Sequence, residues 1–102
     1  MFTSEFFNIG TIVFTQAVNN EVAENKQFAK DIVSAMKKYC LKDWGLVCKE
    51  DGKANDDALN YPDDLYLLGA YDTCKGKIYI ITQRKSEIAG DNCTTVLFPD
   101  EY

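Results

Sequence analysis

Side chains that could do chemistry are few in this sequence, and their types exclude the commonest active sites. The 102 residues contain no histidine, so no Ser/His or Cys/His nucleophile pair can form, and every histidine-dependent metal or acid/base site is excluded. Neither common glycine-rich phosphate-binding motif occurs. We therefore expect no enzyme activity, no catalytic residue and no cofactor.

The four cysteines are scattered, at positions 40, 48, 74 and 93. There is no Cys-x-x-Cys pair, which argues against structural zinc, and we expect no metal. In a reducing cytosol four thiols in a chain with a real core are usually free, so free or buried thiols are expected, with disulfides as the alternative.

Neighbouring carboxylates are the remaining candidates for chemistry, at Asp56 and Asp57 and again at Asp63 and Asp64. A pair of acids can act as general acid and base, or bind a divalent cation. Neighbours on a helix point about a quarter-turn apart, however, and no calcium-loop spacing surrounds these residues. A solvated face is the better interpretation.

The acidic stretch 49–64 gives the strongest indication of function. It holds −4 of the net charge of −5, because six acids meet only two lysines there. A run of carboxylates can imitate a line of phosphates and occupy a basic protein groove; the alternative is a solvated helix that promotes solubility. The residues we assign to partner binding are Trp44, Glu50, Asp51, Asp56, Asp57, Asp63 and Asp64.

Aromatic residues offer a second kind of contact. Trp44, the lone tryptophan, either fills the core or stands out as an interface anchor, and the core is the more frequent outcome. Phe2, Phe6 and Phe7 pose a similar choice, between covering the sheet and forming a dimer contact.

Composition excludes two classes of partner. An acidic chain with a single arginine, Arg84, is poorly suited to a phosphate backbone, so we expect no direct nucleic-acid binding. No apolar run approaches the ~20 residues that cross a bilayer. The N-terminus also does not resemble a signal peptide, so we expect a cytoplasmic protein without membrane contact.

Hydrophobic patterns predict the elements that position these residues. The clearest is an amphipathic helix over about 26–41, because Phe28, Ile32, Met36 and Cys40 recur every fourth residue. Asn25 or Asn19 is its expected N-cap. The other predictions are a strand at 10–15, a turn at 16–20, a short acidic helix at 50–59 and a turn at 60–64.

The last third is rich in strand-forming residues. Strands are predicted at 65–71, 77–82 and 94–98; a tight connection at 72–76 makes the first two a hairpin, 83–92 with Gly90 is a loop, and Pro99 ends the last strand. The prediction is one α+β domain spanning residues 1–102. Its mixed or antiparallel four-stranded sheet packs the amphipathic helix on one face, beside the second short acidic helix.

Three stretches resemble a family of small proteins found on plasmids, phages and integrated elements of Gram-positive bacteria, usually labelled plasmid-related. They are 12–29, with Ile-Val-Phe-Thr at its start; 43–59, opening with Asp-Trp-Gly-Leu; and 70–102, with Lys-Ile-Tyr-Ile-Ile-Thr at 77–82 and Thr-Thr-Val-Leu-Phe-Pro-Asp-Glu-Tyr at 94–102. The segment 83–93 departs from the family pattern by being longer.

The resemblance implies a context, and it brings no catalytic residue. Small acidic proteins of mobile elements often act on host defence, so it implies an inhibitor that binds a protein partner, most specifically an anti-CRISPR that blocks a CRISPR nuclease. The alternative is a structural or regulatory homodimer that supports plasmid or phage maintenance.

Overall fold

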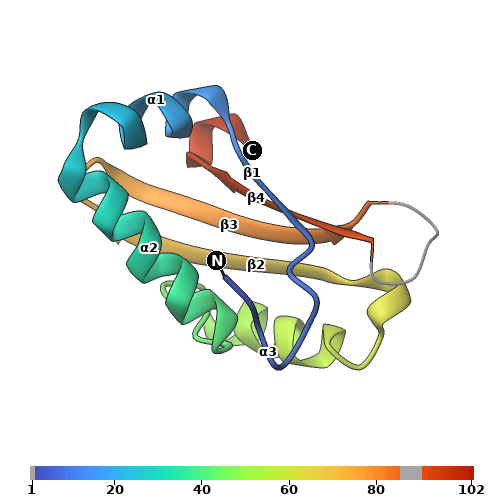
Figure 1. The fold of residues 1–102 in the computed structure, drawn as a ribbon. Helices are drawn as coiled ribbons and strands as arrows, with labels where there is room; N and C mark the ends of the chain where they lie inside the picture. Colours follow the sequence, from blue (N-terminus) through green and yellow to red (C-terminus); the bar gives the residue numbers. More distant parts are fainter. Residues whose placement is uncertain (1, 86–90) are drawn as a thin grey trace.

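Four strands form one mixed sheet in the computed structural model, which describes residues 2–85 and 91–102 (Figure 1). The strands are β1 (Thr11–Phe14), β2 (Tyr66–Thr73), β3 (Gly76–Arg84) and β4 (Asn92–Leu97), in the spatial order β1-β4-β3-β2. β1 runs parallel to β4, and the other two pairings are antiparallel. The predicted α+β class is therefore confirmed, with a mixed sheet.

Three α-helices and two 3₁₀ turns complete the described chain: α1 (Gln16–Glu24), α2 (Lys26–Cys40), α3 (Lys49–Ala58), η1 (Pro62–Asp64) and η2 (Pro99–Glu101). α2 is the predicted amphipathic helix and lies across one face of the sheet, while α3, the acidic helix, runs beside β2 (Figure 1). Both helices match their predicted ranges to within one residue.

α1 corrects the predicted turn at 16–20. Its apolar side chains are too few and its nine residues too short to give a clear helical period. The Thr15 side chain caps it by accepting from the Val18 amide at 3.3 Å, and Val18 is completely buried. Asn25 then ends α1 and caps α2, its Oδ1 accepting from the Phe28 amide at 3.0 Å, as one of the two predicted caps.

The β2–β3 hairpin confirms the predicted pairing but is longer than its apolar residues suggest. Thr73 pairs with Gly76, which leaves Cys74 and Lys75 as the turn, and Gly76 has the positive φ of 96° that suits glycine. At the other end of β3, Arg84 pairs with Asn92 of β4, so β3 and β4 both extend into the loop predicted at 83–92. Backbone pairing extends β3 and β4 over polar residues that gave no strand signal in the sequence. Residues 86–90 of that loop lie outside the described residues.

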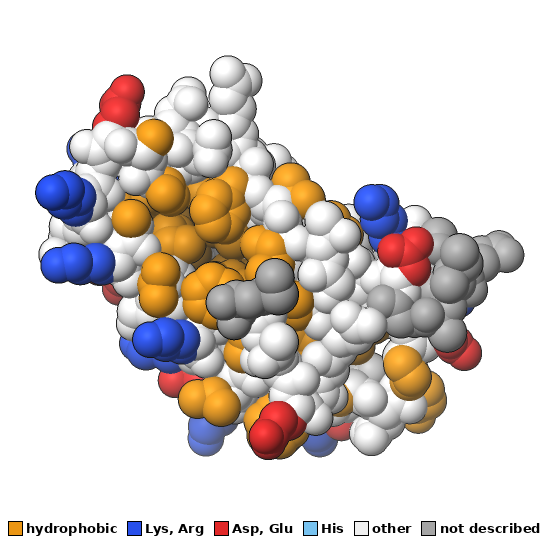
Figure 2. Space-filling view, viewed as in Figure 1, with side chains coloured by type: hydrophobic (Ala, Val, Ile, Leu, Met, Phe, Trp, Pro, Cys, Tyr) orange, Lys and Arg blue, Asp and Glu red, His pale blue; other side chains and the backbone are white. Residues whose placement is uncertain are grey.

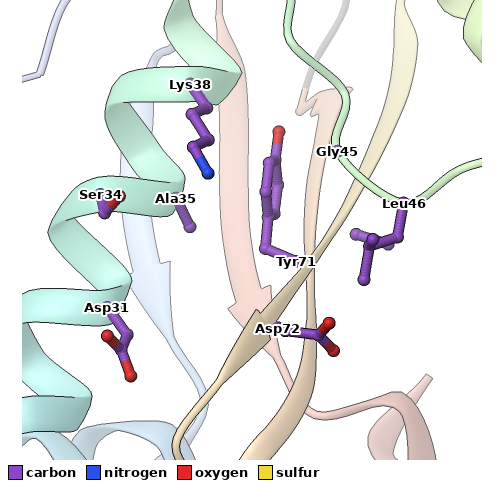
Figure 3. Close-up of a pocket in the computed structure, with 9 residues that line it drawn as sticks. Asp31, Ser34, Ala35, Lys38, Gly45, Leu46, Tyr71 and Asp72 are labelled. Carbon is purple, nitrogen blue, oxygen red and sulfur yellow. The ribbon is translucent and has the colours of Figure 1, made fainter.

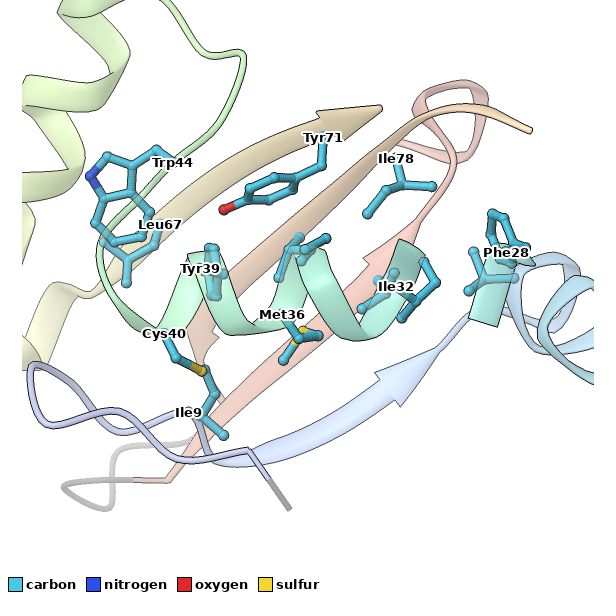
Figure 4. Packing of buried hydrophobic residues seen from close by; sticks show 14 of the residues in the cluster. Ile9, Phe28, Ile32, Met36, Tyr39, Cys40, Trp44, Leu67, Tyr71 and Ile78 are labelled. Atoms are coloured by element: carbon cyan, nitrogen blue, oxygen red, sulfur yellow. The ribbon is translucent and has the colours of Figure 1, made fainter. Parts of the chain in front are cut away.

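The core lies between α2 and the sheet (Figure 4). Phe28, Ile32, Met36 and Tyr39 of α2 are buried against alternate residues of the strands, among them Leu67, Tyr71, Ile78, Ile80 and Val96. Gly69 of β2 leaves room for aromatic rings, because a Cβ there would come within 2.9 Å of the Tyr39 ring and 2.6 Å of the Tyr71 hydroxyl.

A chain of buried hydroxyl groups joins α2 to β3, β4 and the N-terminal segment. Tyr39 donates to Thr82 Oγ1 at 2.7 Å, Thr82 and Thr94 share a bond of 2.7 Å, and Thr94 donates to the Ile9 carbonyl at 2.6 Å. A carbonyl oxygen only accepts, so the Thr94 proton is committed and Thr82 must be the donor to Thr94. Every hydroxyl in the chain therefore has a partner.

α2 alone is too narrow to cover the sheet. A helix is about 10 Å wide, whereas four strands spaced ~4.8 Å apart span about 19 Å. Apolar side chains therefore gather in a patch on the helix side of the molecule (Figure 2), and Phe2, Ile12, Phe14 and Val22 are only half-buried against the core. Val33 of α2 adds a side chain that is 41% exposed.

The opposite face of the sheet carries no described α-helix, and three tyrosines partly cover it. Tyr102 bonds the Tyr66 hydroxyl through its own at 2.6 Å and meets the Tyr79 ring edge-on, with centroids 5.9 Å apart. Ile81 and Leu97 beside them are only 7% and 6% exposed, although they do not belong to the core cluster.

Breaking the hydroxyl chain should destabilise the protein cooperatively. Thr82→Val removes an acceptor from Tyr39 and a donor from Thr94, and we expect it to lower the free energy of unfolding by about 1–3 kcal/mol. Tyr39→Phe with Thr82→Val should cost less than the sum of the single changes, because no orphaned phenol is left. Denaturant unfolding of all three proteins measures this coupling, and strict additivity would contradict it. Thr95→Val, a half-buried threonine of the uncovered face, is the control and should change stability by less than about 0.5 kcal/mol.

Alkaline pH should weaken the tyrosine contact on the uncovered face. Burial and the Tyr102 hydroxyl raise the pKa of Tyr66 to about 12 from an ordinary value of 10.0. A raised phenol pKa stabilises the fold below pH 10, and this contribution is lost as the pH rises through about 12. Burial also raises the pKa of Tyr39 and Tyr71, which adds to the loss. Denaturant unfolding across this range should show a steeper decline in the natural protein than in Tyr66→Phe; equal slopes would contradict the assignment to Tyr66.

Candidate functional site

The six acidic residues predicted from the stretch 49–64 are carried by two successive elements, α3 and η1. Glu50, Asp51, Asp56 and Asp57 belong to α3, and Asp63 and Asp64 to η1; all six are exposed. We call this surface, the six carboxylates of α3 and η1, the acidic ridge. It lies along the β2 side of the sheet (Figure 1).

Two ridge carboxylates hold the ridge in place. Asp56 Oδ1 accepts from the Trp44 indole N–H at 3.0 Å. Asp63 Oδ1 lies 3.5 Å from Arg84 Nη1, and the same nitrogen donates to the Asp63 carbonyl at 2.8 Å. These contacts tie α3 to the core and η1 to β3. For the other four ridge carboxylates the described structure contains no hydrogen bond or ion pair, so they remain available to a partner.

Trp44 belongs to the core, which decides between its two predicted roles. Its side chain is 6% exposed and packs edge-on against Tyr39, with ring centroids 5.4 Å apart. Phe7 joins the same cluster, 5.5 Å from Tyr39, whereas Phe6 is 47% exposed beneath the Lys42 ammonium. Trp44 therefore positions the ridge through Asp56, and it does not project as an interface anchor.

Asn55 is the residue of this region that sequence reasoning missed. It is buried, 4% exposed, and its amide pairs with both backbone groups of Leu68: Nδ2 donates to the Leu68 carbonyl at 2.8 Å, and Oδ1 accepts from the Leu68 amide at 3.1 Å. A side chain thus replaces a neighbouring strand at the outer edge of β2. The signal was present, since Asn55 shares the helix face of Ala58 and Leu59, where an apolar residue is expected.

The segment 44–46, before α3, pairs with the backbone of Ala70, the next outward-facing position on the outer edge of β2. Ala70 donates to the Trp44 carbonyl at 3.1 Å and accepts from the Leu46 amide at 2.7 Å, around a parallel bridge to Gly45. Gly45 has a φ of 74°, and a Cβ there would lie 2.1 Å from the Ala70 carbonyl oxygen. Only glycine allows this approach, which directs the chain from the edge of β2 into α3.

A polar cleft of about 350 Å³ lies between α2 and β2 (Figure 3). Asp31 borders it and accepts from the backbone N–H of Cys74 at 2.8 Å and from Gln27 Nε2 at 2.9 Å. These bonds, the first above all, hold the pKa of Asp31 below its ordinary value. The Tyr71 hydroxyl donates to the Asp43 carbonyl at 2.6 Å. Asp31 and Tyr71 therefore already hold structural bonds, which leaves Asp72 and Lys38, of opposite charge, as the other ionised side chains of the cleft. The ridge gathers more charge of one sign and is the better candidate site.

All four cysteines are free thiols, with Cys40 buried and Cys48 and Cys74 exposed. Over residues 2–85 and 91–102, no three acidic or cysteine side chains gather closely enough to hold a metal ion. Within the same residues, no helix has the length and apolarity that a bilayer crossing requires.

Comparisons with known proteins add no relative: no protein-family model, no curated protein and no solved structure matches this chain. The resemblance to plasmid-related proteins therefore stays an expectation from the sequence, and the function is proposed from the geometry of the ridge.

Removing the Asn55 amide should loosen the ridge from the sheet. Asn55→Ala leaves the Leu68 N–H and carbonyl at a partly buried edge without partners, and we expect the free energy of unfolding to fall by about 1–3 kcal/mol. Amide hydrogen exchange at Leu68 should also accelerate, because its acceptor is lost. Asn20→Ala, an exposed asparagine of α1, is the matched control and should leave both quantities nearly unchanged. Unaltered exchange at Leu68 in Asn55→Ala would contradict the assigned role.

Proposed function

We propose that this protein acts by binding another protein through the acidic ridge, as an accessory protein of a mobile element without a catalytic step of its own. The observation that carries the proposal is that some ridge carboxylates are bonded to the rest of the fold while the others are not. Asp56 and Asp63 fix the ridge to the fold, while Glu50, Asp51, Asp57 and Asp64 point their charge to solvent. A charged surface that is already rigid loses little conformational entropy on binding.

The chemistry of the ridge favours a basic protein surface as the partner. Six carboxylates stand against Lys49 and Lys53, which leaves a net charge of −4. α3 has 10 residues and is therefore about 15 Å long. Double-stranded DNA carries roughly nine charges over that length. The ridge is thus sparser than a nucleic acid, so binding would rest on a few placed ion pairs.

The most specific form of the proposal is an anti-CRISPR inhibitor. A CRISPR nuclease holds its heteroduplex in a positively charged channel, which is the type of surface that a rigid line of carboxylates would occupy. The choice of this partner rests on the resemblance to plasmid-related proteins. The ridge itself supports only the wider class, a protein with a basic groove.

A second candidate is a structural or regulatory homodimer that supports plasmid or phage maintenance. The observation that favours it is the sheet face without a described helix, where Val13 is 42% and Tyr66 41% exposed. Of the phenylalanines expected at such a contact, Phe2 and Phe7 are half-buried against the core, and Phe6 is exposed.

Reversing the free ridge charges should abolish partner binding. The variant Glu50→Lys/Asp57→Lys/Asp64→Lys spares the two anchoring carboxylates, so its circular dichroism should match that of the natural protein. We expect at least about a hundredfold weaker binding, because each attractive pair becomes repulsive. The measurement is a pull-down from a host lysate with an active CRISPR nuclease, followed by a cleavage assay with the purified nuclease.

The matched control is Glu5→Lys/Glu24→Lys/Asp100→Lys, which makes the same change in net charge at exposed positions outside the ridge. It should bind and inhibit like the natural protein. Equal inhibition by the ridge variant would rule out the charge mechanism. Recovery of the bait alone by the natural protein would rule out the nuclease as partner.

A further inference from the structure

The sheet face turned away from α2 is built from every second residue of the strands. Cross-strand pairs place Leu68 beside Ile81, Tyr79 beside Leu97, and Val13 beside Thr95, all on this side. The remaining members are Thr11, Tyr66, Ala70, Asp72, Lys77, Gln83 and Cys93. We call these thirteen side chains the open face; Tyr102 lies over one part of it.

Charge is nearly absent from the open face. Of its side chains only Asp72 and Lys77 are ionised at neutral pH, and they stand directly opposite each other on β2 and β3. Glu101 of η2 lines a hollow of the same face, beside Tyr66 and Thr95, so the surface that two copies would share holds one uncompensated carboxylate in a chain of net charge −5. Two copies that meet there therefore bring little like charge together, although the two molecules as wholes repel each other weakly.

The apolar patch on the helix side is the rival surface, and its surroundings are less suited to a symmetric contact. Lys30 and Lys37 stand on α2 one turn before and after Val33, and all three side chains are exposed. In a dimer with two-fold symmetry the same patch faces itself, so the lysines of one copy would lie near those of the other. The open face avoids this repulsion.

The size of the open face fits a modest dimer. The strands hold 4, 8, 9 and 6 residues, and each residue covers about 3.4 Å by 4.8 Å of sheet, so the flat footprint is on the order of 440 Å². Over two partners this is about 900 Å², below the ~1,200–2,000 Å² of a standard interface, so the contact has the size of a weak, transient one. Tyr66, Tyr79 and Tyr102 supply aromatic side chains of the kind that interfaces favour.

We propose that two copies of this chain associate face to face through the open face, as two sheets packed about 10 Å apart. The inference rests on the second candidate function and names its surface. The small footprint sets the affinity, so we expect a dissociation constant of about 1–100 μM. The acidic ridge stays outside the contact, which lets the dimer present two ridges.

Light scattering with sedimentation velocity from about 1 μM to about 1 mM tests the proposal, over the affinity range in question. The mass should rise from 11.5 kDa toward twice that value. Val13→Glu should stay monomeric, because it places a charge on the open face. Val33→Glu is the matched control, with the same substitution at the same exposure on the helix-side patch, and it should dimerise normally.

Two outcomes would overturn the proposal: a monomer at every concentration, or dimerisation lost in Val33→Glu and kept in Val13→Glu. Neither bears on ridge binding, which the pull-down tests with a monomer as well as with a dimer.

Thiol labelling provides a second test that needs no substitution. Cys93 lies on the open face, whereas Cys48 and Cys74 are exposed at the cap of α3 and in the hairpin turn. Maleimide labelling of Cys93, followed by peptide mass spectrometry, should slow roughly tenfold when the protein is about a hundredfold above its dissociation constant. Cys48 and Cys74 should react at constant rates. A Cys93 rate that does not change with concentration would overturn the proposal.

Discussion

The buried hydroxyl chain from Tyr39 to the Ile9 carbonyl is the constraint on which the rest of the structure depends. It joins α2, β3, β4 and the N-terminal segment inside the protein, through bonds between residues that are 12 to 85 positions apart in the sequence. Each hydroxyl has one proton, and the terminal carbonyl fixes its direction through the whole chain. An unpaired member would cost about 1–3 kcal/mol, so only one placement of α2 on the sheet satisfies all of them.

The aromatic cluster and the edge of β2 extend this constraint to the functional surface. Tyr39 contacts the Trp44 ring, whose indole holds Asp56, while Asn55 and the 44–46 segment pair with the outer edge of β2. An unpaired sheet edge invites association with other chains. Here the covering of that edge also places α3, so the acidic ridge is presented by the elements that protect the sheet.

The two proposed surfaces differ in the physics that would make them bind. The ridge offers placed charges, which steer a partner and lose strength as salt is added. The open face offers apolar and aromatic area with little charge, so added salt should weaken a contact there less than one at the ridge. Because they occupy separate parts of the molecule, one chain can use both, and a dimer would present two ridges to a partner with more than one basic groove.

The sequence by itself determined the α+β class, the amphipathic helix, the hairpin and the acidic segment, because these depend on periodicity, turn residues and charge that are local. It did not indicate α1, whose short apolar pattern becomes helical only once Val18 is buried, nor the strand ends near Arg84 and Asn92, which backbone pairing decides. Only the tertiary structure decided that Trp44 is internal, that Asn55 completes the β2 edge, and which ridge carboxylates are free. Those outcomes depend on contacts between residues distant in the chain, and no local pattern encodes which distant partner a side chain meets.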